Sequence, residues 1–167
     1  MKVINNFFKW LIVAALILLI AFGFWAQDKY AVPVLMYHHV KARPIKELNV
    51  VTPKVFNKQM KFLRRFGYKV LTMDEYIQTK KNGGKFARNS VVITFDDGYE
   101  DNYQYAFPVL KDYNFSATIF IVSDLIGKHP LLNWKQVKEM DQYGITIASH
   151  TRHHRYLPNI IDDELKN

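Results

Sequence analysis

The sequence predicts an α/β fold on a mostly parallel sheet, preceded by one membrane-spanning helix. From Val32 onward, short runs of strand formers alternate with segments of helical periodicity, which is typical of βα units. Before them, Trp10–Ala26 carries no charge and approaches the roughly 20 residues that a membrane-spanning helix needs. Only five strands are expected, whereas a closed (β/α) barrel has about eight, so the sheet is either open and small or part of an incomplete barrel.

The N-terminal apolar segment is expected to be an uncleaved signal anchor. Lys2 and Lys9 precede most of it and are expected to stay cytoplasmic, which puts the rest of the chain outside the membrane. The alternative is a cleaved signal peptide, and the protein would then be secreted. Large side chains at Phe24 and Trp25, directly before Ala26, make a poor cleavage site.

The predicted strands are short apolar runs rich in β-branched and aromatic residues, bounded by turn formers. The first, Val32–Tyr37, is apolar on both faces and is expected to be buried. The full set is Val32–Tyr37, Tyr68–Thr72, Val91–Phe95, Ser116–Val122 and Ile145–Ser149.

The predicted helices have identifiable start and stop signals. Thr52 and Pro53 open the first, and Thr72 with Glu75 forms a capping box that opens the second. Pro108 is expected to kink or interrupt the third. The helices are expected at Thr52–Gly67, Thr72–Lys80, Asp101–Tyr113 and Trp134–Tyr143, with a further one starting near Ile161.

Composition narrows the functional classes. Hydrophobic residues make up 49% of the chain, so a packed core is expected. The absence of cysteine excludes disulfides, Cys-ligated zinc and a lipid-modified Cys anchor. The net charge of +8 suits an anionic surface or polymer, but Lys and Arg are dispersed rather than gathered in a stripe, which disfavours nucleic-acid binding.

Titratable side chains follow three predicted strands, where working residues of parallel α/β folds are found. They are Asp96 and Asp97, His150 and His154, and His38 and His39. Two imidazoles and one carboxylate form a three-ligand set for a divalent metal, with open positions for water and substrate. Zn²⁺ is the first expectation, and Co²⁺, Ni²⁺ or Fe²⁺ also suit these ligands.

Each of these signals has a simpler interpretation. Asp-Asp-Gly after a strand is often only a turn with a helix cap. A His pair four residues apart, as at His150 and His154, is often a solvated helix face, and His153 offers a competing pair. His39 and His129 are expected to be solvated. The coincidence of the aspartates and the His pair at one rim favours the metal site.

The motifs TFDDG (Thr94–Gly98) and HTRHH (His150–His154) resemble the first two motifs of the polysaccharide deacetylases, the NodB-homology group of carbohydrate esterase family four. The resemblance covers about Val32 to Leu165. It implies a partial (β/α) barrel of the deacetylase type and metal-dependent hydrolysis of N-acetyl groups on acetylated amino-sugar polymers. It also implies that Asp96 is the general base and that Asp97, His150 and His154 are the metal ligands.

The opening PVLMYHHV resembles the branch that deacetylates poly-β-1,6-N-acetylglucosamine, in which a Tyr-His pair at the start of the domain supplies the general acid. His38 matches that position. The later motifs of the family are not reached, so residues 32–167 are expected to be an incomplete deacetylase domain after a stub, anchor (about 7–26) and linker in residues 1–31. The alternative function is a truncated pseudo-enzyme that binds cell-surface polysaccharide. No protein partner is expected.

Overall fold

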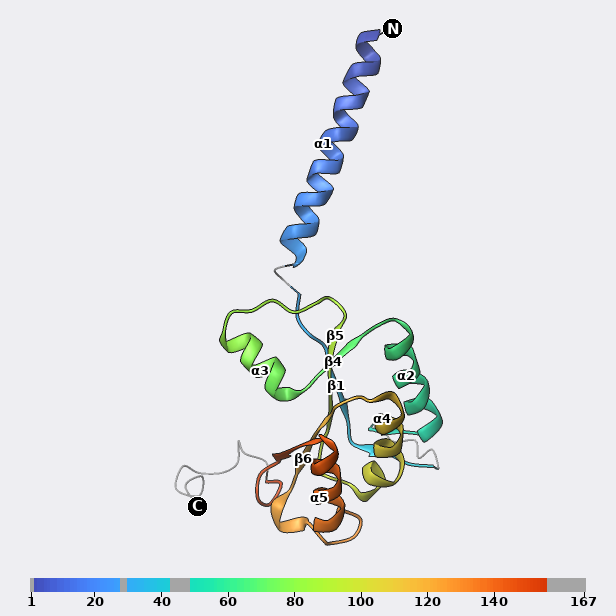
Figure 1. Ribbon diagram of the computed structural model, residues 1–167, viewed down its shortest axis with the longest axis vertical. Helices are drawn as coiled ribbons and strands as arrows, with labels where there is room; N and C mark the ends of the chain where they lie inside the picture. Colours follow the sequence, from blue (N-terminus) through green and yellow to red (C-terminus); the bar gives the residue numbers. More distant parts are fainter. Residues whose placement is uncertain (1, 28–29, 43–48, 156–167) are drawn as a thin grey trace.

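The computed structural model describes residues 2–27, 30–42 and 49–155, and their main sheet has five parallel strands (Figure 1). This confirms the predicted α/β fold. The helix expected near Ile161 lies outside the described residues. The strands are β1 (Val34–Tyr37), β4 (Lys69–Leu71), β5 (Ser90–Phe95), β6 (Thr118–Ile121) and β7 (Thr146–Ser149), and a separate two-stranded sheet pairs β2 (His39–Val40) with β3 (Val50–Val51).

Strand β5 lies at the centre of the main sheet. It pairs with β1 along one edge and with β4 and then β6 along the other. Strand β7 pairs with β6, and every pair is parallel. The carboxyl ends of β1, β5, β6 and β7 therefore meet at one rim of the sheet, which is where the predicted site residues follow their strands.

Strand β1 corrects one prediction. It was expected to be apolar and buried on both faces, but Val34 is 48% and Met36 61% exposed. Only the other face, which carries Leu35 and Tyr37, packs against the core. Apolar content on both faces does not guarantee burial, because burial needs an element that covers each face.

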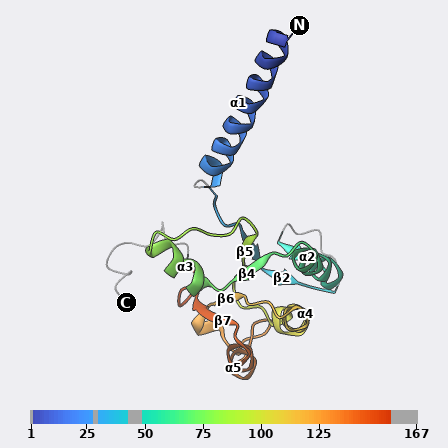
Figure 2. The ribbon, with the colours of Figure 1, turned by 45° about the horizontal axis from the view of Figure 1, so that its top comes forward.

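Three helices cover one face of the sheet, namely α2 (Pro53–Arg65), α4 (Phe107–Tyr113) and α5 (Trp134–Tyr143) (Figures 1 and 2). The core between them and the strands is fully buried; its largest members include Phe56, Met60, Phe95, Leu110, Ile119 and Met140. Helix α3 (Met73–Lys81) lies apart from these three, and Met73 and Tyr76 contact a smaller cluster of Val32, Leu71 and Val92. Together, these layers leave the rim accessible.

The predicted helix signals act as expected. The Thr52 hydroxyl accepts a hydrogen bond from the Val55 N–H, and Thr72 with Glu75 forms the complete capping box. The third helix is divided into a π-helical segment η1 (Asn102–Ala106) and α4, with Pro108 in the first turn of α4. Pro108 has no N–H to continue the hydrogen-bond ladder, so the predicted interruption is confirmed.

Helix α1 (Lys2–Gln27) projects from the sheet domain as a long rod (Figure 1). Its segment Asn6–Trp25 is long and apolar enough to cross a membrane, and none of that segment is buried against the rest of the chain. The side chains of such a helix would be shielded from water by lipid.

Candidate metal centre and active site

The two adjacent aspartates after β5 are separated by an unusual backbone. The Asp96 N–H donates to the Tyr37 carbonyl at 2.9 Å, so Asp96 still continues the sheet. Asp97 then adopts φ 69° and Gly98 φ 73°, both left-handed. Such a φ is costly for a residue with a side chain and is concentrated at functional sites. The turn directs the Asp97 carboxylate toward the loop that follows β7.

Three predicted ligands converge there. The Asp97 Oδ1 atom lies 3.4 Å from Nε2 of His150 and 3.1 Å from Nε2 of His154. All three candidate ligand atoms lie within 4.8 Å of one another. Ligands of a tetrahedral zinc, each about 2.1 Å from the ion, are roughly 3.4 Å apart. The spacing therefore fits a divalent metal.

The hydrogen bonding of Asp97 also fits a role as a cation ligand. Its Oδ1 atom is buried and has no hydrogen-bond partner, although both imidazole nitrogens are near. A buried carboxylate oxygen without a partner is costly. A cation shared by the three side chains would satisfy it, and nitrogen and oxygen donors of this kind suit Zn²⁺ and its neighbours.

The His pair does not come together through a helical turn, although a spacing of four residues would place both imidazoles on one face of a helix. Residues 150–154 form an irregular loop in which Thr151 has φ 65° and His154 φ 54°. The His154 N–H donates to the Thr151 hydroxyl at 3.0 Å, and the His150 N–H donates to the Ile121 carbonyl at 2.8 Å. Two left-handed residues, not helical periodicity, therefore bring the imidazoles together.

Asp124, in the short helix η2 (Ser123–Leu125), contacts this loop through both its side chain and its backbone. Its carboxylate accepts from Arg152 Nε at 3.1 and 3.2 Å and lies 3.2 Å from His153 Nδ1. Its backbone N–H donates to the Arg152 carbonyl. His153 is thus turned toward Asp124, so the competing pair of His150 and His153 does not form the cluster.

Asp124→Ala is expected to lower Zn²⁺ affinity by roughly three- to tenfold, because groups that orient ligands contribute to affinity but exposed ion pairs are weak. Titration of the metal-free chain against a competing chelator measures this. Asp141→Ala, which removes an exposed carboxylate on α5, should leave the affinity unchanged. Equal affinities in all three proteins would show that the contacts of Asp124 are irrelevant to the ligands.

A histidine and an aspartate face each other next to the cluster of Asp97, His150 and His154. His38, directly after β1, places Nε2 4.0 Å from Oδ2 of Asp96, and both side chains are partly exposed. This places the predicted general acid opposite the predicted general base, on neighbouring strands. A small substrate group between them could give a proton to one and take a proton from the other.

His39 contradicts the expectation that it is solvated. It is 7% exposed, its Nδ1 lies 2.7 Å from Asp101 Oδ2, and its ring stacks on Tyr99 at a centroid distance of 3.6 Å. His129 is exposed as expected, with Nδ1 3.8 Å from a Glu100 oxygen. Of the six residues predicted at the rim, three form the cluster and two, Asp96 and His38, face each other beside it. The sixth, His39, is buried against Asp101.

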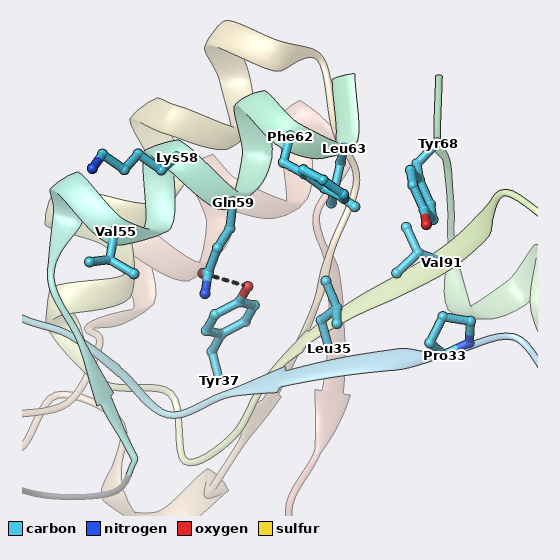
Figure 3. Close-up of a pocket in the computed structure, with 10 residues that line it drawn as sticks. All are labelled: Pro33, Leu35, Tyr37, Val55, Lys58, Gln59, Phe62, Leu63, Tyr68 and Val91. Carbon is cyan, nitrogen blue, oxygen red and sulfur yellow. Dashed lines mark hydrogen bonds between the residues drawn. The ribbon is translucent and has the colours of Figure 1, made fainter. Parts of the chain in front are cut away.

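A separate apolar hollow of about 480 Å³ lies between α2 and β1 (Figure 3). Lys58 is its one charged lining residue, and no carboxylate or imidazole that could bind a metal is among its lining residues. Beside it, the Tyr37 hydroxyl donates to Gln59 Oε1 at 3.0 Å, and burial raises the pKa of Tyr37 to about 12. The hydroxyl therefore remains a donor that ties the end of β1 to α2.

Sequence reasoning missed Asp101 and Asp124 as supports of the site. Neither belongs to a quoted motif, and their partners are distant along the chain: Asp101 pairs with His39, and Asp124 with Arg152 and His153. The only signal for either support was an acidic residue shortly after a strand: Asp101 follows TFDDG, and Asp124 follows β6.

Comparison with known proteins finds similar sequences. The Polysaccharide deacetylase family profile matches residues 83–167. YxkH of Bacillus subtilis is 44% identical over 122 residues, which cover 73% of this chain and 43% of YxkH. The poly-β-1,6-N-acetyl-D-glucosamine N-deacetylase of Staphylococcus epidermidis is 40% identical over 60% of this chain and 37% of its own length.

A solved structure extends the likeness to the fold. The deacetylase PplD of Streptococcus pyogenes, determined in complex with acetate, superposes with a TM-score of 0.74 and 32% identity. The match covers 80% of this chain and 62% of PplD. By contrast, the chain spans less than half the length of YxkH and of the S. epidermidis deacetylase. Because the family profile covers just over half of the chain, the chain belongs to the polysaccharide deacetylase family.

Proposed function

We propose that this chain is a metal-dependent N-deacetylase of an acetylated amino-sugar polymer, with poly-β-1,6-N-acetylglucosamine as the favoured substrate. The observation that carries the proposal is the convergence of Asp97, His150 and His154 beside the Asp96–His38 pair. The likeness to a relative named for poly-β-1,6-N-acetyl-D-glucosamine supports the substrate.

In this proposal, Asp97, His150 and His154 hold the cation, and Zn²⁺ is favoured over Co²⁺ or Ni²⁺. When bound by these three side chains, a divalent cation would supply a lower pKa for the water at the site and polarisation of the acetyl carbonyl. Asp96 accepts the proton of the attacking water, and a protonated His38 gives its proton to the leaving nitrogen. Water and the amide are thereby converted to acetic acid and a free amine, and transfer of the acid proton to the amine through solvent gives acetate and an ammonium group. The proton taken up by Asp96 returns to His38 through solvent, which restores both side chains.

The proposal places α1 in the membrane and residues 32–167 outside it. Arg88 Nη2 donates to the Gly23 carbonyl at 2.9 Å, which brings the segment before β5 close to the end of α1. Strand β5 then runs six residues, or about 20 Å, from Ser90 to the site aspartates. The rim would therefore face away from the lipid, toward polymer outside the cell.

Acetate release from a poly-β-1,6-N-acetylglucosamine oligomer tests the proposal. The full chain in detergent micelles is expected to release acetate with Zn²⁺ present, and to stop after chelation and resume on adding metal back. The S. epidermidis relative is the positive control. Oligomer binding without acetate release, while the relative is active, would instead identify a polysaccharide-binding pseudo-enzyme.

A further inference from the structure

Asp101 has a carboxylate that is 12% exposed and is directed entirely at the segment after His38. One oxygen lies 2.7 Å from Nδ1 of His39, and the other accepts the Val40 N–H at 3.1 Å. Asp101 occupies the N-cap position of η1, yet its side chain makes no capping hydrogen bond. The ordinary role of an aspartate at that position is therefore not the one it performs.

One of the two contacts satisfies a backbone N–H of β2. On one edge of β2, the His39 N–H donates to the Asn49 carbonyl at 3.2 Å and the Lys41 N–H donates to the Val51 carbonyl at 3.0 Å. The intervening Val40 N–H points to the opposite edge, where no strand is paired among the described residues. Asp101 takes the place of a neighbouring strand there.

His38 is consequently held from both sides by one short segment. Before it, the Tyr37 carbonyl accepts from the Asp96 N–H at 2.9 Å. After it, the next two residues bond to Asp101, five positions beyond Asp96 along the chain. The segment that carries Asp96 and Asp97 is thereby joined to the His38 segment at two points.

We infer that Asp101 is a positioning residue that holds His38 at its 4.0 Å separation from Asp96, acting through His39 and the Val40 N–H. This inference rests on the proposed function for its catalytic consequence. It predicts that Asp101 affects proton donation by His38 and leaves the metal ligands unaffected, because Asp97, His150 and His154 make none of these contacts.

Kinetics with the full chain and the acetylated oligomer test the inference. Asp101→Ala is expected to lower kcat by about 10- to 100-fold, part of what an acid–base group contributes, with KM and Zn²⁺ affinity unchanged. Asp101→Asn should recover activity to within about threefold, since its amide oxygen can still accept the Val40 N–H. In a His38→Ala background, Asp101→Ala should cause no further loss.

Asp112→Ala, an exposed carboxylate on α4, is the matched control and should match the unaltered chain. Imidazole NMR spectra give an activity-independent readout: Asp101→Ala should shift or broaden the His38 signals, whereas the Zn²⁺-induced shifts of His150 and His154 persist. If the unaltered chain releases no acetate, the proposed function fails and the His38 signals alone decide. Unchanged His38 signals, additive losses in the double variant or a parallel fall in Zn²⁺ affinity would overturn the inference.

Discussion

Asp97→Ala is expected to abolish metal binding, whereas Asp96→Asn should keep the metal and lose hydrolysis. Asp97 Oδ1 is the atom that faces both imidazoles, and Asp96 Oδ2 faces His38 instead. Groups that only orient ligands contribute about 10- to 100-fold to affinity, so loss of a ligand should exceed about 100-fold. Loss of a general base should lower kcat by about 100- to 10,000-fold.

Zinc titration and acetate release, measured on the same preparations, separate the two roles. Asp96→Asn replaces a charge with a neutral group of the same shape, so a change in folding is not expected. Thermal unfolding of both variants checks this point. The division of roles between the neighbouring aspartates would be wrong if the two variants lost zinc equally, or if Asp97→Ala retained it.

Gly98→Ala is the second change with a large expected effect. Gly98 has φ +73°, and an added Cβ would lie 2.9 Å from Cγ2 of Ile121. The left-handed backbone costs about 1–2 kcal/mol for alanine, and overpacking adds about 1–3 kcal/mol, so the free energy of unfolding should fall by about 2–5 kcal/mol. The Ile121 carbonyl accepts the His150 N–H, so the crowding should also weaken zinc binding.

Gly83→Ala separates the two causes of this loss. Gly83 has a similar φ of +65°, but an added Cβ there would meet nothing within 4 Å. It should lose only the backbone contribution, about 1–2 kcal/mol, and keep full zinc affinity. Near-ultraviolet circular dichroism follows the loss of packing of the sheet domain's aromatic side chains, and any contribution of α1, which carries Trp10 and Trp25, is common to both variants. Equal destabilisation by both substitutions would show that the contact with Ile121 is unimportant.

Most elements of the fold could be predicted because their signals are local. The hydroxyls of Thr52 and Thr72 cap the helices that follow them, and the chain reverses at Gly144 after α5, all within a few residues. The main-sheet strands were found from the same short-range patterns. Strands β2 and β3 were missed because two residues carry no periodicity.

The candidate site was predicted less completely. The strand-end rule brought Asp96, Asp97, His38, His150 and His154 to one rim, and the folded chain gathers them there. Their individual roles remain predictions. His39 was misjudged because a His after a strand is equally compatible with solvent and with a buried partner, and its partner Asp101 lies 62 positions away.

The amino-acid sequence alone was therefore sufficient for the alternating elements, the apolar N-terminal helix and the residue types at the rim, since these depend on periodicity, caps and chain direction. Only the tertiary structure decided how the side chains are aimed. The left-handed angles at Asp97, Thr151 and His154 direct the candidate ligands, and such costly angles persist only where the surrounding structure holds them. The contacts of Asp101 and Asp124 also depend on the tertiary structure, because each joins segments that only folding brings together.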